Sequence, residues 1–297
     1  MAVKFPHQLF VPILVFFVLL PFVAKATPFR FESLQNLKQA QKGDVANGIH
    51  QVKQFLKAFG YYPHQINLLD DRFDDVLESA IKTFQEFYHL NVTGEIDHGT
   101  IKAMSTPRCG VPDINLEQTS NGHNHGMFHL VSNYTFFDGN PRWSKYGLTY
   151  NFLPDSLQVN FQVVRPVVAS AFQRWAAVSP FRFQEVAQGY RADIRLGFYR
   201  GNHGDEDPFD GPQGVLAHAF SPPDGRFHYD ADESWSTNPG RSQIDLESVT
   251  VHELGHNLGL GHSQYQSAIM YPSISPGTIK RDLGQDDVNG LRALYRY

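Results

Sequence analysis

The stretch at residues 251–262 constrains this chain more than any other, because its spacing fits one metal-binding geometry. It reads VHELGHNLGLGH. On an α-helix, His252 and His256 are four residues apart, so both imidazoles project from one face and can share a metal ion. Gly259 can take a positive φ and turn the chain out of the helix, which would bring His262 back as a third ligand. Three imidazoles and one open position are the layout of a catalytic zinc site.

Two further residues belong to this pattern. Glu253 follows the first ligand directly, where its carboxylate can reach a metal-bound water and act as a general base. Met270, in the sequence AIMYP, can form a tight turn beneath the metal. A bare H-E-x-x-H also occurs in ordinary core helices as two unrelated histidines. The longer pattern with Gly259, His262 and the later methionine turn is the metzincin signature.

The first 26 residues are typical of a secretory signal peptide. Lys4 precedes an apolar run at residues 9–23, and Ala24-Lys25-Ala26 fits a small-x-small cleavage pattern. An uncleaved anchor is the competing interpretation. We expect the mature protein to be secreted and extracellular, in a matrix or apoplast, with no membrane span. In that compartment Asn91 and Asn133, which begin N-V-T and N-Y-T, are potential glycosylation sites.

Charge and cysteine content narrow the function further. The net charge of −5 and the lack of a Lys/Arg block argue against nucleic acid as a partner. Cys109 is the single cysteine, so it cannot close an internal disulfide. Either the thiol is used by a metal or a partner, or it is a small buried hydrophobe.

At 297 residues the chain is long enough for two domains. A polar lead at residues 27–47 is expected to be loose. Apolar residues at helical spacing then predict a small three-helix bundle, and the Asn/Gly/Ser/His-rich residues 115–133 predict an exposed linker. Beyond residue 143 the pattern is mixed α and β, with strands expected at 148–152, 181–186 and 194–199 and helices at 161–178 and from about 285. Residues 201–220 form a polar loop that would need ions to order it.

Two separated motifs resemble a matrix metalloproteinase zymogen. One is HELGHNLGLGH with the AIMYP turn, and the other is PRCGVPD at residues 107–113, which matches the family's cysteine switch. The resemblance covers about 49–297 and is closest to plant-type members without a hemopexin-like domain. It implies an α+β protein with a small helical-bundle prodomain (peptidoglycan-binding-like) followed by a zincin/metzincin catalytic domain, a twisted, mostly parallel sheet with three helices. The implied segments are a signal peptide (1–26), prodomain (27–106), switch (107–113), activation linker (114–135) and catalytic domain (136–297).

The resemblance also implies roles for individual residues. Cys109 would occupy the fourth zinc position, since a thiolate is a better soft ligand than water, and Arg108 and Asp113 would pair to hold its loop. A structural zinc would be bound by His203, Asp205, His218 and His228. Calcium would be bound by the carboxylates of Asp210, Asp230 and Glu233 and the backbone oxygens of Gly211, Gln213 and Val215. Asp193 resembles a ligand of a further calcium, and Asp286 would bind the N-terminal ammonium formed on activation.

Two positions depart from the family pattern, and a third lies with one of them at the substrate pocket that the resemblance implies. Asn257 stands where a small or apolar residue is usual, and Ile274 replaces the usual tyrosine. By resemblance, Ile274 and Ser248 face the pocket for the residue after the scissile bond. These positions leave the chemistry intact and bear on side-chain preference.

We therefore expect a secreted, monomeric, zinc- and calcium-binding endopeptidase made as a latent zymogen. Its partners would be extracellular or matrix protein substrates and an activating protease. Two other classes compete with this prediction: a metal-stabilised binding module, which would not need Glu253, and a metal-sensing or thiol-redox protein centred on Cys109, which would need a second cysteine.

Overall fold

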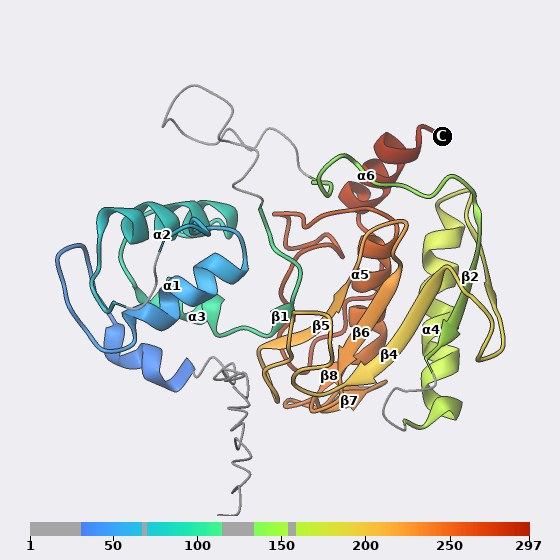
Figure 1. Cartoon of the computed structure of the whole chain (residues 1–297), viewed down its shortest axis with the longest axis horizontal. Helices are drawn as coiled ribbons and strands as arrows, with labels where there is room; N and C mark the ends of the chain where they lie inside the picture. The colour runs from blue at the N-terminus through green and yellow to red at the C-terminus, as the bar shows by residue number, and fades with distance from the viewer. Residues whose placement is uncertain (1–30, 67–69, 115–133, 154–158) are drawn as a thin grey trace, which may run out of the picture.

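The computed structural model describes residues 31–66, 70–114, 134–153 and 159–297. Two hydrophobic cores organise these residues, one among the N-terminal helices and one between a sheet and its helices (Figure 1). The predicted signal peptide, most of the predicted linker and Asn133 lie outside the described residues. No described helix is long and apolar enough to cross a membrane.

The N-terminal core is built on three α-helices and one 3₁₀ helix. They are η1 (Phe31–Leu37), α1 (Ile49–Ala58), α2 (Asp75–Phe87) and α3 (His98–Met104). Asp74 begins α2 by accepting a hydrogen bond from Leu77 N, and Asp97 begins α3 by accepting one from Thr100 N. Both are N-cap interactions that satisfy free amides of the first turn. The predicted helical bundle is confirmed.

For the described residues 31–47, the expectation of a loose lead before this bundle was wrong. Leu34 and Leu37 are almost completely buried, and Ala40 forms a β-bridge with Ile96. Most residues of this segment are polar, so the three apolar side chains that pack it against the core gave no recognisable pattern in the sequence.

The second core lies under a six-stranded sheet ordered β1-β5-β6-β4-β2-β3. Along the chain the strands are β1 (Arg108–Cys109), β2 (Gly147–Phe152), β3 (Arg182–Glu185), β4 (Ile194–Tyr199), β5 (Val215–Ala219) and β6 (Arg226–Asp230). Only β5 and β6 pair antiparallel; the other pairings in this sheet are parallel. A short parallel pair, β7 (Trp235–Ser236) and β8 (Ile244–Asp245), lies beyond β6. The mostly parallel sheet is as predicted.

Three helices complete this part: α4 (Phe161–Ala177), α5 (Leu246–Asn257) and α6 (Gln285–Tyr295). In Figure 1, α4 and α5 lie together over one face of the sheet. The Trp175 indole of α4 donates a hydrogen bond of 2.9 Å to Val251 O of α5, which fixes the two helices side by side. The helix that carries the HExxH motif is thus the inner one, buried along its whole length.

A two-residue strand connects the N-terminal region to the sheet. β1 adds to the edge at β5, with Arg108 N donating to Gly214 O (2.8 Å) and Gly110 N to Ala217 O (2.8 Å). On its other side, Cys109 N donates to Pro272 O at 2.9 Å. The segment therefore lies between β5 and the chain that follows Met270. The sequence did not predict β1, which exists through pairing with a strand more than a hundred residues away, or β5, which lies between β1 and β6 in the sheet.

Candidate active site

The helix α5 and the turn after it place three histidines on one point. Asp245 begins the helix by accepting from Ser248 N. Gly259 has a φ of 98°, and a Cβ there would clash with the carbonyl oxygen of Pro141. A glycine is thus required at this position, and the chain turns as predicted so that His262 faces His252 and His256.

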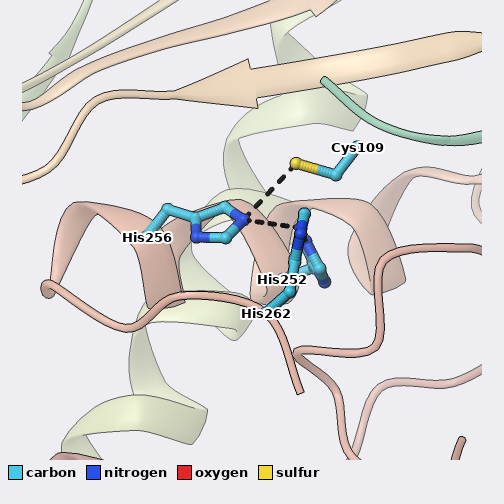
Figure 2. A group of neighbouring side chains, drawn as sticks. All are labelled: Cys109, His252, His256 and His262. Atoms are coloured by element: carbon cyan, nitrogen blue, oxygen red, sulfur yellow. Dashed lines mark hydrogen bonds between the residues drawn. The ribbon is translucent and has the colours of Figure 1, made fainter. Parts of the chain in front are cut away.

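The four predicted ligand atoms converge (Figure 2). His252 Nε2 and His262 Nε2 are 3.3 Å apart, and His256 Nε2 lies 3.1 Å from His262 Nε2. Cys109 Sγ lies 3.4 Å from His256 Nε2. Tetrahedral zinc, with bonds of about 2.0–2.3 Å, separates its ligand atoms by roughly 3.3–3.6 Å. The donor set and its spacing fit a zinc ion.

The other ring nitrogens of the histidines are held by neighbours. His252 Nδ1 lies 2.7 Å from Ile269 O, and His256 Nδ1 lies 2.8 Å from Leu260 O. A proton on Nδ1 leaves Nε2 free for a metal. Burial lowers the pKa of all three imidazoles and so favours the neutral, ligating form.

Glu253 is completely buried next to this group. Neither carboxylate oxygen has a hydrogen-bond partner in the described part of the chain. Burial raises the pKa of Glu253 to about 8. A buried acid without partners is costly unless a ligand uses it, so a metal-bound water is the species this carboxylate fits.

The methionine turn packs against α5 through a glycine. A Cβ on Gly255 would clash with Met270 Sδ, so the absence of a side chain lets the turn approach the helix. The buried Asp287 of α6 holds the same turn: its carboxylate accepts from Ile269 N (2.8 Å) and Met270 N (3.0 Å). The role of Asp287 was not predicted from the sequence. An acidic first turn of α6 was visible, but nothing local indicated what the carboxylate would accept.

Arg108 and Asp113 hold the loop around Cys109. Arg108 Nη2 lies 2.6 Å from Asp113 Oδ1, and both side chains are buried. The Arg108 guanidinium also donates to Tyr88 O–H (2.9 Å), while Tyr61 O–H donates to Asp113 Oδ2 (2.7 Å). Burial raises the pKa of Asp113, but the charges and hydrogen bonds of Arg108 and His262 together outweigh this effect and lower that pKa to about 2. The predicted pair is therefore anchored in the N-terminal core by two tyrosines that the sequence did not reveal.

Asp113 also contacts the metal group, meaning Cys109, His252, His256 and His262, directly. Its Oδ1 lies 2.7 Å from Nδ1 of His262. A carboxylate on the second nitrogen of a metal-binding histidine orients the ring and makes it a stronger ligand. One side chain thus connects the switch loop with the third histidine.

A second group is formed by His218 of β5, His228 of β6 and two residues of the loop at 201–214. Asp205 Oδ2 lies 2.9 Å from His203 Nε2, 2.8 Å from His218 Nε2 and 2.7 Å from His228 Nδ1. The three imidazoles hold the pKa of Asp205 well below its usual range against the opposing effect of burial. Three nitrogens and one carboxylate form a closed donor set that suits a structural zinc.

Comparison with known proteins agrees with this geometry. A family model described as Matrixin matches residues 142–296. The chain belongs to the matrixin family. A second model, described as a putative peptidoglycan binding domain, matches residues 46–104. These matches confirm the family resemblance and the endopeptidase class. Matrixins depend on zinc, in agreement with the histidine group.

Individual relatives extend over both matched regions. "Metalloendoproteinase 1" of Glycine max is 45% identical over 93% of this chain and 92% of its own length. "Metalloendoproteinase 5-MMP" of Arabidopsis thaliana is 43% identical over 91% of this chain and 77% of its own. "Neutrophil collagenase" of Homo sapiens is 37% identical over 82% of this chain and 49% of its own. The similarity to plant-type members predicted from the motifs is therefore confirmed.

In this matrixin the predicted calcium residues are neighbours, though more widely spaced than the two histidine groups. Asp210 accepts from Val215 N (3.0 Å), Asp230 from Gly211 N (3.3 Å) and Glu233 from Gln213 N (2.6 Å). Burial raises the pKa of Asp210 and of Glu233 to about 7. Among described residues, only the two histidine groups bring three or more ligand atoms within 4.8 Å. Calcium binding stays a prediction.

Asp193 and Asp286 differ in what they contact. Asp193 Oδ1 lies 2.8 Å from Lys145 Nζ and its Oδ2 accepts from Thr149 N, so protein groups already use both oxygens. Asp286 Oδ2 is buried without a hydrogen-bond partner in the described part of the chain. Asn91, the described glycosylation candidate, is exposed.

Asn257, Ser248 and Ile274, which bear on the family pattern, all have defined surroundings in this matrixin. Asn257 at the end of α5 donates from Nδ2 to Phe220 O and Arg226 O, each at 3.0 Å, which joins the helix to the ends of β5 and β6. Ser248 Oγ accepts from Lys280 N at 2.8 Å. Ser248 and Ile274 line a pocket beside His252 and Glu253, as the family resemblance implied.

Proposed function

We propose that this matrixin is a secreted zymogen that hydrolyses peptide bonds of extracellular or matrix proteins. The observation that carries the proposal is the convergence of Cys109 Sγ with the three histidines. Three imidazoles leave one position of a tetrahedral zinc ion free, and the thiol lies where the nucleophilic water would otherwise bind.

In the active form, His252, His256 and His262 hold the metal. Zinc bound there supplies a Lewis acid that lowers the pKa of water towards about 7 and polarises the scissile carbonyl. Glu253 takes the proton from the nucleophilic water and passes it to the leaving amine. Burial raises the pKa of Glu253 when the site holds no metal, and the charge of a zinc ion beside it would lower that pKa and favour the carboxylate that accepts the proton. Met270 is a packing floor beneath the histidines and does not react.

Latency rests on the switch segment. Cys109 would bind the metal as a thiolate, although burial and the charge of Glu253 raise the pKa of the free thiol. A cation at the histidine group reverses that preference. The buried Arg108–Asp113 pair keeps the loop closed around the sulfur.

Activation would remove the inhibitory segment. In this proposal an activating protease cuts within residues 114–135, which separates the prodomain and switch (27–113) from the catalytic domain (136–297). The new N-terminal ammonium then binds Asp286, whose buried, unpartnered oxygen supports this role.

Further metals complete the proposed enzyme. His203, Asp205, His218 and His228 hold a structural zinc. Asp210, Asp230 and Glu233, with backbone oxygens of Gly211, Gln213 and Val215, hold a calcium ion whose charge would relieve the repulsion among the buried carboxylates. Asp193 binds calcium only if the ion displaces Lys145.

The proposal also covers processing outside the cell. Residues 1–26 direct secretion and are removed, the mature enzyme is a monomer, and Asn91 and Asn133 carry glycans. None of these steps changes the chemistry of the metal group.

The test is cleavage of internally quenched peptides by the purified full chain, before and after a thiol-reactive mercurial. We expect latency that the mercurial relieves, and loss of the resulting activity with a chelator or in Glu253→Ala. The Cys109→Ser chain should be active without mercurial. Activity of the untreated chain would contradict latency, and inactivity of the Cys109→Ser chain on a broad peptide library would contradict the protease.

A further inference from the structure

A pocket beside the metal group contains one lysine. The pocket lining includes Cys109, His252 and Glu253, so it opens next to the atoms that perform the chemistry. Its walls are mostly apolar, with Leu216, Val249 and Ile269 among them. Lys280 lines the same pocket and is the only charged group there besides Glu253 and the metal ligands.

The backbone of Lys280 is tied to the metal helix. Lys280 N donates to Ser248 Oγ at 2.8 Å, and Ser248 lies one helical turn before His252. Asp245 in turn accepts from both the amide (2.8 Å) and the hydroxyl (2.6 Å) of Ser248. These hydrogen bonds tie the backbone of Lys280 to the first turn of α5.

The ammonium of Lys280 has no ion pair within the described residues. Its Nζ lies 5.3 Å from the centroid of the Tyr271 ring, another pocket residue. The nearby acids are engaged elsewhere: Asp287 accepts from the turn at Met270, and Asp245 pairs with Arg281. Burial lowers the pKa of Lys280 to about 8 against the opposing charge of Asp287, as expected for a cation partly removed from water.

We propose that Lys280 selects substrates with an acidic side chain, glutamate above all, directly after the scissile bond. The inference rests on the proposed proteolytic function and names its substrate class. The apolar walls take the methylene groups of a glutamate, and the ammonium takes its carboxylate. Ile274 and Ser248, which the family resemblance places at the pocket for this residue, line the same cavity.

The test compares peptides that differ only in the residue after the scissile bond. The zinc-loaded full chain is activated with a mercurial and offered glutamate, glutamine, leucine and lysine at that position. We expect kcat/KM for glutamate to exceed that for glutamine by about tenfold or more, because the two side chains match in size and differ in charge. Lys280→Met should abolish this ratio, and Lys280→Glu should favour the lysine peptide.

A matched control and a second measurement separate this inference from the protease itself. Lys145→Met makes the same change of charge at an exposed lysine paired with Asp193, and it should keep the ratio. Binding of peptide hydroxamates that begin with glutamate or glutamine, measured by calorimetry on the activated Glu253→Gln chain, needs no turnover. Equal binding of the two hydroxamates, or a ratio that survives Lys280→Met, would overturn the role of Lys280. If the chain binds the glutamate hydroxamate more tightly than the glutamine one but cleaves no peptide, the proposed proteolytic function is contradicted and the role of Lys280 is not.

Discussion

Glu253 is the residue whose environment is hardest to explain without catalysis. Its carboxylate is fully buried, lacks hydrogen-bond partners in the described chain and has a pKa of about 8. Glu253→Gln keeps the size and removes the base, so kcat should fall by about 10²–10⁴-fold. Peptide cleavage by the activated chain measures this change. Zinc content should not change, because Glu253 is not in the ligand group; retained activity would contradict its role as base.

The residues of the metal site could be predicted from the sequence because they lie close together along the chain. His252, Glu253, His256, Gly259 and His262 lie within one short segment, where helical spacing alone determines which side chains meet. Asp287, Tyr61 and Lys280 could not be found this way. Each acts on a partner from another part of the chain, and an acid, a tyrosine or a lysine at those positions has no distinctive local pattern.

At the scale of elements, α5 depends on a glycine inside a helix. Alanine is usually better than glycine in a helix interior by about 1 kcal/mol. At Gly255, however, a Cβ would clash with Met270, so Gly255→Ala should destabilise the protein and displace the methionine turn. Overpacking of this kind costs about 1–3 kcal/mol. Denaturant unfolding of the full chain measures the effect.

Gly99 of α3 provides the matched control. A Cβ there would meet its nearest neighbour, Asp97, at 3.4 Å, an ordinary contact. Gly99→Ala should therefore be neutral or stabilising. Equal effects of the two substitutions on the free energy of unfolding would contradict the claim that Gly255 is needed for the turn to pack against α5.

Elements with strong local patterns were predicted well, and those made by pairing were not. The helix α4 and the strand β4 match their expected ranges closely, since apolar periodicity within each segment determines them. The strands β1, β5 and β6 escaped prediction although they are largely buried, because their short segments become strands by pairing with one another. β5 lies at the end of a segment rich in Gly and Asp, and its partners β1 and β6 complete it.

At the scale of the whole molecule, the buried Arg108 connects the two cores. Arg108→Met would leave Asp113 buried without its cation and remove the contact with Tyr88. Breaking one side of a buried pair costs about 3–5 kcal/mol, so the switch should open more often. We expect faster labelling of Cys109 by a thiol reagent and activity without mercurial. Lys102→Met, an exposed change of the same charge on α3, is the control; equal labelling rates in both variants would contradict the role of Arg108.

The central claim is that Cys109 is a ligand of the catalytic zinc in the full chain. Zinc-edge X-ray absorption of the zinc-loaded protein measures this coordination directly. We predict a sulfur neighbour at about 2.3 Å, present in the full chain and absent both from Cys109→Ser and after activation. The second zinc group contains no sulfur, so it cannot mimic the signal. Identical spectra for the full chain and Cys109→Ser, without a sulfur shell, would contradict the account.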